Sequence, residues 1–140
     1  ATDNQPAKIS RTRPARNYDT SFFWEGVDKD ELLIQHCKSC DTLRHPPGPM
    51  CMHCNSLEWD TVTSSGKGTL YSYVVMPHPA IPPFDYPNIV GLVELEEGTR
   101  LVTQIVGTKP DAIEIGMPVE LCIEEVEEGL KLPLFKIAGA

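Results

Sequence analysis

From residue 66 onward, hydrophobic and polar side chains alternate along most of the chain. In the clearest case, apolar Val119, Leu121 and Ile123 are separated by Glu120 and Cys122. A period of two is typical of strands that bury one face. The alternation predicts five strands: Thr69–Met76, Ile89–Glu96, Arg100–Val106, Pro118–Val126 and Leu132–Ala138.

The connections between these strands carry turn residues. "EEGT" at 96–99 and "EEG" at 127–129 predict tight hairpins, and "TKPDAIEIG" at 108–116 predicts one short turn of helix between the third and fourth strands. Three strands, a short helix and two more strands are the order of the OB-fold, a small closed barrel. We therefore predict a mainly β protein with a five-stranded OB-fold barrel over residues 66–140.

One connection is long: "PHPAIPPFDYPN" at 77–88 joins the first two predicted strands. It holds five prolines together with Phe84 and Tyr86. In OB-folds this loop borders the usual binding face. Because long loops with apolar tips commonly make contacts, we predict that this one is a contact surface.

Four of the five cysteines fall in one window, "HCKSCDTLRHPPGPMCMHCNS" at 36–56. They form two CxxC pairs with ten residues between the pairs. Two facing CxxC loops place four thiolates at the corners of a tetrahedron, which is the geometry that Zn²⁺ accepts. We predict one metal ion, zinc with iron as the alternative, bound by Cys37, Cys40, Cys51 and Cys54. Four thiolates leave no open position for water, so the predicted ion is structural.

The neighbours of the cysteines fit such a site. A metal-binding CxxC loop, called a knuckle, requires a left-handed backbone just after its second cysteine. Asp41 and Asn55 occupy these two positions. Asp and Asn are the non-glycine residue types that adopt this backbone most readily. His36, His45 and His53 lie in the same window. With four thiolates available, we expect these histidines to be exposed and not to be ligands.

Before the cysteines, "NYDTSFFWEGVDKDE" at 17–31 predicts a short helix that Asp19, Thr20 or Ser21 caps and Gly26 ends, and "ELLIQHC" at 31–37 predicts a strand. With the cysteine pairs, these elements form a predicted module over residues 18–65. Three consecutive aromatic residues are too many for one narrow helix face, so they dock either on this chain or on a partner. As predicted partner contacts we name Phe22, Phe23, Trp24, Phe84 and Tyr86.

Charge is distributed unevenly. Residues 1–18 carry four basic side chains against one acidic, whereas the rest of the chain carries eight basic against 19 acidic. We expect residues 1–17 to be a flexible basic linker, and most acidic side chains near the end of the chain to lie on a solvated face. No apolar run approaches the roughly 20 residues of a membrane span, and no charged region followed by an apolar stretch suggests secretion. We expect a cytoplasmic protein that does not contact membranes.

Two alternative functions follow from these parts. A zinc ribbon followed by an OB-fold suggests nucleic-acid binding, with Tyr71 and Tyr73 on one face of the first barrel strand as stacking residues. The acidic barrel argues against this, because it repels phosphate backbones. A rubredoxin-like iron electron carrier is compatible with the cysteine pairs but needs no barrel.

Several segments in this order resemble a known family. "FFWEGVDKDELLIQHCKSCDTLRHPPGPMCMHCNS", "SSGKGTLYSYVV", "YPNIVGLVELEEGTRLVTQIVG" and "IGMPVEL" are similar to the OB-fold family with a rubredoxin-like zinc ribbon that accompanies acyl-CoA enzymes. The resemblance runs from about Tyr18 to the end. Family members often have glycine after each second cysteine and arginine after the paired prolines, where this chain has Asp41, Asn55 and Gly48.

The resemblance implies a small non-catalytic subunit or fused domain. Such members bind thiolase-fold enzymes and help to present or channel an acyl-CoA. For this chain we expect a two-plus-two heterotetramer with a thiolase-fold enzyme, with the acyl-CoA at the shared interface. In the branch that degrades steroid side chains, the domain follows an enoyl-CoA hydratase and partners a thiolase-like aldolase. The basic leader then resembles a linker of such a fusion, and a free subunit fits equally well. Since the histidines are three neighbours of the cysteines and His78, with no evident catalytic set, we expect no intrinsic activity.

Overall fold

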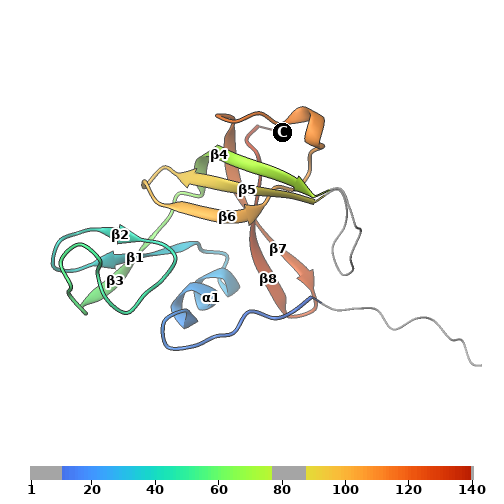
Figure 1. Cartoon of the computed structure of the whole chain (residues 1–140). Helices are drawn as coiled ribbons and strands as arrows, with labels where there is room; N and C mark the ends of the chain where they lie inside the picture. Colours follow the sequence, from blue (N-terminus) through green and yellow to red (C-terminus); the bar gives the residue numbers. More distant parts are fainter. Residues whose placement is uncertain (1–10, 77–87, 140) are drawn as a thin grey trace, which may run out of the picture.

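Two antiparallel sheets follow each other along the chain, as the computed structural model shows for residues 11–76 and 88–139 (Figure 1). The first sheet has the strand order β2-β1-β3 and is preceded by a single short helix. The second has the order β6-β5-β4-β7-β8. The first group of elements is α1 (Ser21–Asp28), β1 (Leu33–Cys37), β2 (Leu43–Arg44) and β3 (Trp59–Thr63). The second group is β4 (Lys67–Met76), β5 (Asn88–Leu95), β6 (Arg100–Gln104), the 3-10 turn η1 (Pro110–Ala112), β7 (Pro118–Glu127) and β8 (Leu130–Ile137).

The second sheet curls into a nearly closed barrel. Its ends meet in a parallel bridge between Ile105 and Phe135, where the Val106 amide donates to the Phe135 carbonyl at 2.9 Å. Closure leaves fewer unpaired strand edges, which would otherwise promote association. The five predicted strands each match one of β4–β8 to within two residues at either end. The predicted mainly β fold with a helix, a small cysteine-containing sheet and a five-stranded barrel is therefore confirmed.

One continuous hydrophobic core joins the barrel to the base of the small sheet. Leu70, Val93 and Phe135 are completely buried in the barrel, and Val27 and Ile34 from α1 and β1 belong to the same cluster. Helix α1 thus lies against this chain's own strands β1 and β8. No helix in the part of the chain that the structure describes is both long and apolar enough to span a membrane.

Gly26 does not end the helix, contrary to the prediction. Helix α1 continues to Asp28, and Gly26 is buried inside it. A Cβ atom at Gly26 would lie 2.8 Å from Cδ1 of Leu33. Glycine at this position therefore leaves room for the Leu33 side chain to pack closely against α1, and it is not a stop signal.

The helix start also differs from the prediction. Thr20 occupies the N-cap position but makes no side-chain capping bond. Instead, the Asn17 side-chain oxygen accepts hydrogen bonds from the amides of Asp19 and Thr20 at 3.0 and 3.1 Å. An Asn side chain that accepts from the following amides forms a turn of its own. This turn at Asn17 sets the direction in which the chain enters α1.

A β-bulge changes the face that strand β4 presents. The register with β5 shifts between Leu70 and Ser72. Tyr71 lies at the bulge and is exposed, whereas Tyr73 packs against the core. Because the extra residue reverses the alternation, the two tyrosines do not share a face. The prediction that Tyr71 and Tyr73 form one stacking surface is wrong.

Hydrogen bonds join the segment between β3 and β4 to the turn between β5 and β6, and we call this set of bonds the latch. The Ser64 hydroxyl donates to Glu97 at 3.1 Å, and the Ser65 amide donates to the same carboxylate at 2.7 Å. The Ser65 hydroxyl donates to Glu96 at 2.7 Å, and the Gly66 amide donates to the Ser64 hydroxyl. Glu96 and Glu97, which we expected on a solvated face, therefore accept hydrogen bonds from the segment between β3 and β4. Hydrogen bonds to charged acceptors are among the stronger ones in proteins.

Candidate metal centre and apolar groove

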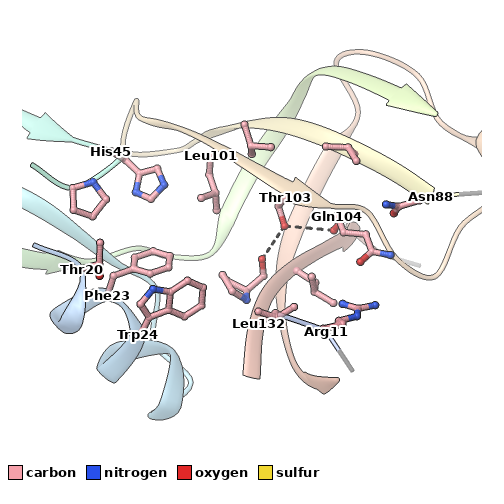
Figure 2. A pocket seen from close by; sticks show the side chains of 15 residues that line it. Arg11, Thr20, Phe23, Trp24, His45, Asn88, Leu101, Thr103, Gln104 and Leu132 are labelled. Carbon is pink, nitrogen blue, oxygen red and sulfur yellow. Dashed lines mark hydrogen bonds between the residues drawn. The ribbon is translucent and has the colours of Figure 1, made fainter. Parts of the chain in front are cut away.

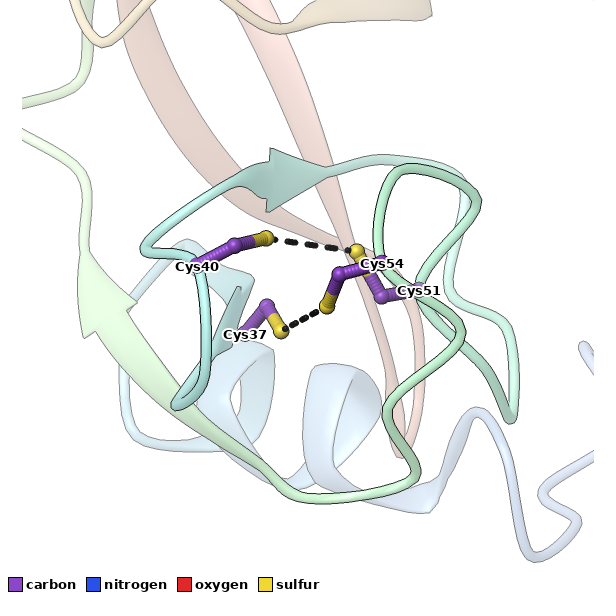
Figure 3. Close-up of side chains that lie close together, drawn as sticks. All are labelled: Cys37, Cys40, Cys51 and Cys54. Atoms are coloured by element: carbon purple, nitrogen blue, oxygen red, sulfur yellow. Dashed lines mark hydrogen bonds between the residues drawn. The ribbon is translucent and has the colours of Figure 1, made fainter.

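The four predicted cysteines come together at one point of the small sheet. Cys37 ends β1, Cys40 follows three residues later, and Cys51 and Cys54 lie in the segment between β2 and β3 (Figure 3). Their four sulfur atoms all lie within 4.8 Å of one another, and the Cys37–Cys54 and Cys40–Cys51 pairs are each 3.6 Å apart. Tetrahedral zinc with Zn–S bonds of about 2.3 Å requires sulfur atoms about 3.8 Å apart. The donor set therefore fits a tetrahedral metal ion.

The backbone of each knuckle has the predicted shape. Asp41 and Asn55 both have a φ of 63°, in the left-handed region. Their amides donate to the carbonyls of Cys37 and Cys51, each at 2.9 Å. The same arrangement in both CxxC loops turns each pair of thiols towards a common centre. The prediction that Asp41 and Asn55 adopt the left-handed backbone is confirmed.

Electrostatics of the cluster favour a bound cation. The amides of Cys54 and His53 lower the pKa of Cys51 to about 6. Although the Ser56 amide lowers the pKa of Cys54, the neighbouring cysteines and burial raise it to about 12. Four thiolates at this spacing repel one another, so a central cation is needed to keep all of them ionised.

The three nearby histidines have separate environments. The His36 ring lies between the carboxylates of Asp60 and Asp41, and the Asp60 hydrogen bond raises the pKa of His36 above its ordinary value. His45 packs against the Phe23 ring with the centroids 5.5 Å apart, and burial lowers its pKa. Only His53 is exposed as expected; His36 and His45 are partly buried. The metal-ligand geometry includes none of the three.

The aromatic residues of α1 divide between this chain's interior and its surface. Phe23 is 6% exposed and belongs to the core, so it is not available for direct partner contact in this structure. Phe22 packs on Trp59 with the centroids 4.9 Å apart. Trp24 is partly buried and lies edge-on to Phe23. The other two predicted contact residues, Phe84 and Tyr86, lie outside the described residues.

An apolar groove of about 470 Å³ lies beside Trp24 (Figure 2). Its far wall is the seam between β6 and β8, where the Thr103 hydroxyl donates to the Pro133 carbonyl at 2.8 Å. Val102 on this wall is 67% exposed. Sequence periodicity does not predict this groove, because its walls come from α1, β6 and β8, which are distant in sequence.

Comparisons with known proteins agree with this architecture. Residues 24–60 match the family model described as the ChsH2 rubredoxin-like zinc ribbon domain, and residues 61–124 match the ChsH2 C-terminal OB-fold domain. The fold and the cysteine cluster thus define a zinc-ribbon and OB-fold protein. A chain of a solved structure described as "Ltp2-ChsH2(DUF35) aldolase" is 55% identical, with a TM-score of 0.87 over 90% of this chain and 99% of that chain. The chain belongs to the DUF35 family of ChsH2-type proteins.

Two curated relatives are longer than this chain. A probable enoyl-CoA hydratase alpha subunit from Thermomonospora curvata is 53% identical over 98% of this chain and 43% of that protein. The 3-oxo-4,17-pregnadiene-20-carboxyl-CoA hydratase alpha subunit from Mycobacterium tuberculosis is 44% identical over 76% of this chain and 34% of that protein. The chain therefore spans less than half the length of either relative.

Proposed function

We propose that this chain is a non-catalytic accessory component that binds a thiolase-fold acyl-CoA enzyme, a retro-aldolase of steroid side chains. It supports the stability or activity of that enzyme, or the transfer of its acyl-CoA substrate. The observation that carries the proposal is the 55% identity to a chain that belongs to an aldolase structure and is covered over 99% of its length. The steroid substrate class rests on the name of the Mycobacterium tuberculosis relative.

The candidate metal centre supports a structural role. Four sulfur donors complete a tetrahedron around Zn²⁺, with Fe as the other metal that such a site accepts, and leave no position for substrate. His36 is held by two carboxylates, and His45 packs against an aromatic ring. In this proposal the metal holds the ribbon in shape, and the partner supplies the reacting groups.

The surface around α1 is the proposed partner contact. Trp24 lines an apolar groove whose other wall carries the exposed Val102, and such aromatic anchors dominate binding energy when they lie at the centre of an interface. Phe22 continues this surface on the ribbon side, next to Trp59. Phe84 and Tyr86 remain proposed contacts from the loop outside the described residues. The proposed assembly is two-plus-two, with the acyl-CoA at the shared interface.

Co-expression with the candidate aldolase tests this function. We expect the pair to co-purify and to cleave its acyl-CoA substrate, whereas the isolated chain shows no turnover. Trp24→Ala is expected to weaken the complex by about 2 kcal/mol. Tyr18→Ala is the control, since Tyr18 is 89% exposed and precedes the helix. Turnover by the isolated chain, or an aldolase that is equally soluble and active alone, contradicts the proposal.

Nucleic acid is not a proposed partner. The net charge is −8, and Arg100 lies over the Tyr71 ring at 3.8 Å and covers one of the expected stacking residues. We therefore expect no salt-sensitive binding of single-stranded DNA or RNA at physiological ionic strength. A micromolar dissociation constant that rises steeply with salt, measured by fluorescence anisotropy, contradicts this expectation.

A further inference from the structure

Residues 11–17, which we call the arginine segment, run past the turn between β7 and β8 before the chain enters α1 (Figure 1). The segment contains Arg11, Arg13 and Arg16. Each of these three residues donates to an acceptor in a distant part of the chain. Neither the metal centre nor the proposed partner contact accounts for these bonds.

The first anchor of the arginine segment is the turn between β7 and β8. The Arg11 amide donates to Oε1 of Glu127 at 2.9 Å, and Nη2 of Arg13 donates to the Glu128 carbonyl at 2.8 Å. The same nitrogen lies 3.9 Å from Oε2 of Glu127, whose side chain is 17% exposed. Because a partly buried carboxylate is screened less by salt than an exposed one, Glu127 is the main acceptor of this anchor.

The second anchor is the end of α1. Nη1 of Arg16 lies 2.8 Å from Oδ2 of Asp28, and this hydrogen bond lowers the pKa of Asp28 below its ordinary value. From β8, the Lys131 ammonium donates to the Asp28 carbonyl at 3.4 Å and to Asp30 at 3.1 Å. The arginine segment, α1 and β8 therefore meet at one corner of the molecule.

The two anchors support each other. A single exposed charge pair contributes little to stability, because water and salt screen it. Here both anchors act on one short segment, and Arg11 is only five residues from Arg16. Once one anchor is closed, the other closes at a high effective concentration. The pair of anchors should therefore hold the segment more firmly than either anchor alone.

The position of Arg11 matters because Arg11 also lines the apolar groove. It does so together with Leu132 and Gln104, at the other end of the groove from Trp24 (Figure 2). The first anchor thus determines where the chain that precedes residue 11 arrives at the barrel, and this place is one end of the groove.

We propose that the turn between β7 and β8 is a docking site for the chain's own arginine segment, and that the docked segment is a strap. The strap fixes the direction in which the chain before residue 11 leaves the barrel. A folded domain attached before residue 11 would then be held beside the groove and would not swing on a flexible tether. For residues 11–17, this proposal replaces the expectation of a flexible linker. It does not depend on the proposed function.

The test uses the zinc-loaded full chain with a nitroxide label at Thr12→Cys, an exposed position within the first anchor. Cys122→Ser removes the thiol that lies outside the metal cluster. We expect the label to broaden the NMR amide signals of residues 127–131. The amide signals of Asp111 and Ala112, which lie away from this turn, should stay sharp (Figure 1).

A mixed sample separates a strap within one chain from a segment exchanged between two copies. The labelled chain, without isotope enrichment, is mixed with an unlabelled chain enriched for NMR. A strap within one chain leaves the enriched chain unbroadened. Exchange between copies, as in domain swapping, broadens residues 127–131 of the enriched chain and overturns the proposal.

Two variants and one control make the test specific. Glu127→Ala removes the main acceptor, so the broadening should be lost. In the unlabelled chain, trypsin should then cleave after Arg11 about fivefold faster, because proteolysis follows the population of the detached form. Glu120→Ala is the matched control: it removes the same charge from β7, where Glu120 pairs with Lys136. Arg13→Ala should also reduce the broadening, and it leaves the turn itself unchanged.

Equal broadening with and without Glu127→Ala and Arg13→Ala overturns the strap, as does an unchanged rate of cleavage in Glu127→Ala. An equal effect of Glu120→Ala would mean that net charge, and not the anchor, holds the segment. These measurements involve no partner enzyme. A failed strap therefore leaves the accessory-component proposal standing, because that proposal is measured by co-purification and turnover.

Discussion

The knuckle segment (residues 38–58) and the barrel are stabilised by different interactions. From residue 38 to residue 58, Cys51 is the only buried residue. The barrel instead buries large side chains from every strand, among them Leu70, Val93, Val119 and Phe135. A segment without a core depends on its cross-link, whereas a barrel depends on packing. The base of the ribbon, with Val27 and Ile34 in the shared core, belongs energetically to the barrel.

Loss of the metal is the strongest test of this difference. We expect Cys40→Ser, or removal of the metal by a chelator, to unfold the knuckle segment, because structural zinc contributes on the order of 10 kcal/mol in small ribbons. Strands β4–β8 should keep their NMR amide dispersion. Cys122→Ser is the matched control, since Cys122 lies on β7 far from the cluster in sequence. Soluble, folded protein that contains neither zinc nor iron contradicts the metal assignment.

Truncation of a buried barrel side chain tests the other half of this comparison, because it should destabilise the barrel. Phe135 is completely buried at the closure of the barrel, so Phe135→Ala should cost about 3–5 kcal/mol of unfolding free energy. Chemical denaturation measures this loss. Val102→Ala, on an exposed position of β6, should change the unfolding free energy by less than about 0.5 kcal/mol. An equal loss in both variants means that the barrel does not depend on its buried packing.

A smaller effect tests the contact between α1 and β1. Alanine improves helix propensity by about 1 kcal/mol over glycine, but at Gly26 its Cβ overlaps Leu33. We expect Gly26→Ala to destabilise the protein by about 1–2 kcal/mol in thermal unfolding. Gly48→Ala, with no atom within 4 Å of the new Cβ, is the control and should be close to neutral. A stabilised Gly26→Ala variant would show that propensity outweighs packing at this position.

The smallest predicted effect concerns the backbone of the second knuckle. Asn55 has a φ of 63°, so Asn55→Ala should cost about 1 kcal/mol and Asn55→Gly should stabilise the zinc-loaded protein slightly. The same two changes at exposed His53, which does not have a positive φ, should not show this preference for glycine. Thermal unfolding of all four variants checks the prediction, and equal melting temperatures for Asn55→Ala and Asn55→Gly disprove it.

The features that the sequence predicts are those encoded over a few residues. The spacing of the cysteines and the left-handed positions of Asp41 and Asn55 depend on local chain geometry, and the structure agrees with them. The period-two alternation is local as well, which is why the five strands are located to within two residues.

The features that sequence reasoning misses depend on contacts between distant elements. From the sequence alone, Gly26 indicates the end of a helix, whereas in the structure it leaves room for the Leu33 side chain. The bulge at Tyr71 depends on the register between β4 and β5. One cavity is lined by Arg44 of β2 and by Thr99 of the turn between β5 and β6, so it lies between two elements that are distant in sequence. None of these pairings leaves a periodic pattern in a single sequence, so only the tertiary structure reveals them.

The latch at the junction has an evolutionary consequence. Ser64 and Ser65 belong to the segment that leaves the ribbon, whereas Glu96 and Glu97 belong to a hairpin of the barrel. A ribbon transferred by recombination onto a different barrel retains these bonds only if the recipient hairpin carries matching acids. Substitutions at 64 and 97 should therefore be correlated among related chains, and chimaeras that mismatch the two positions should show a looser hinge between the ribbon and the barrel.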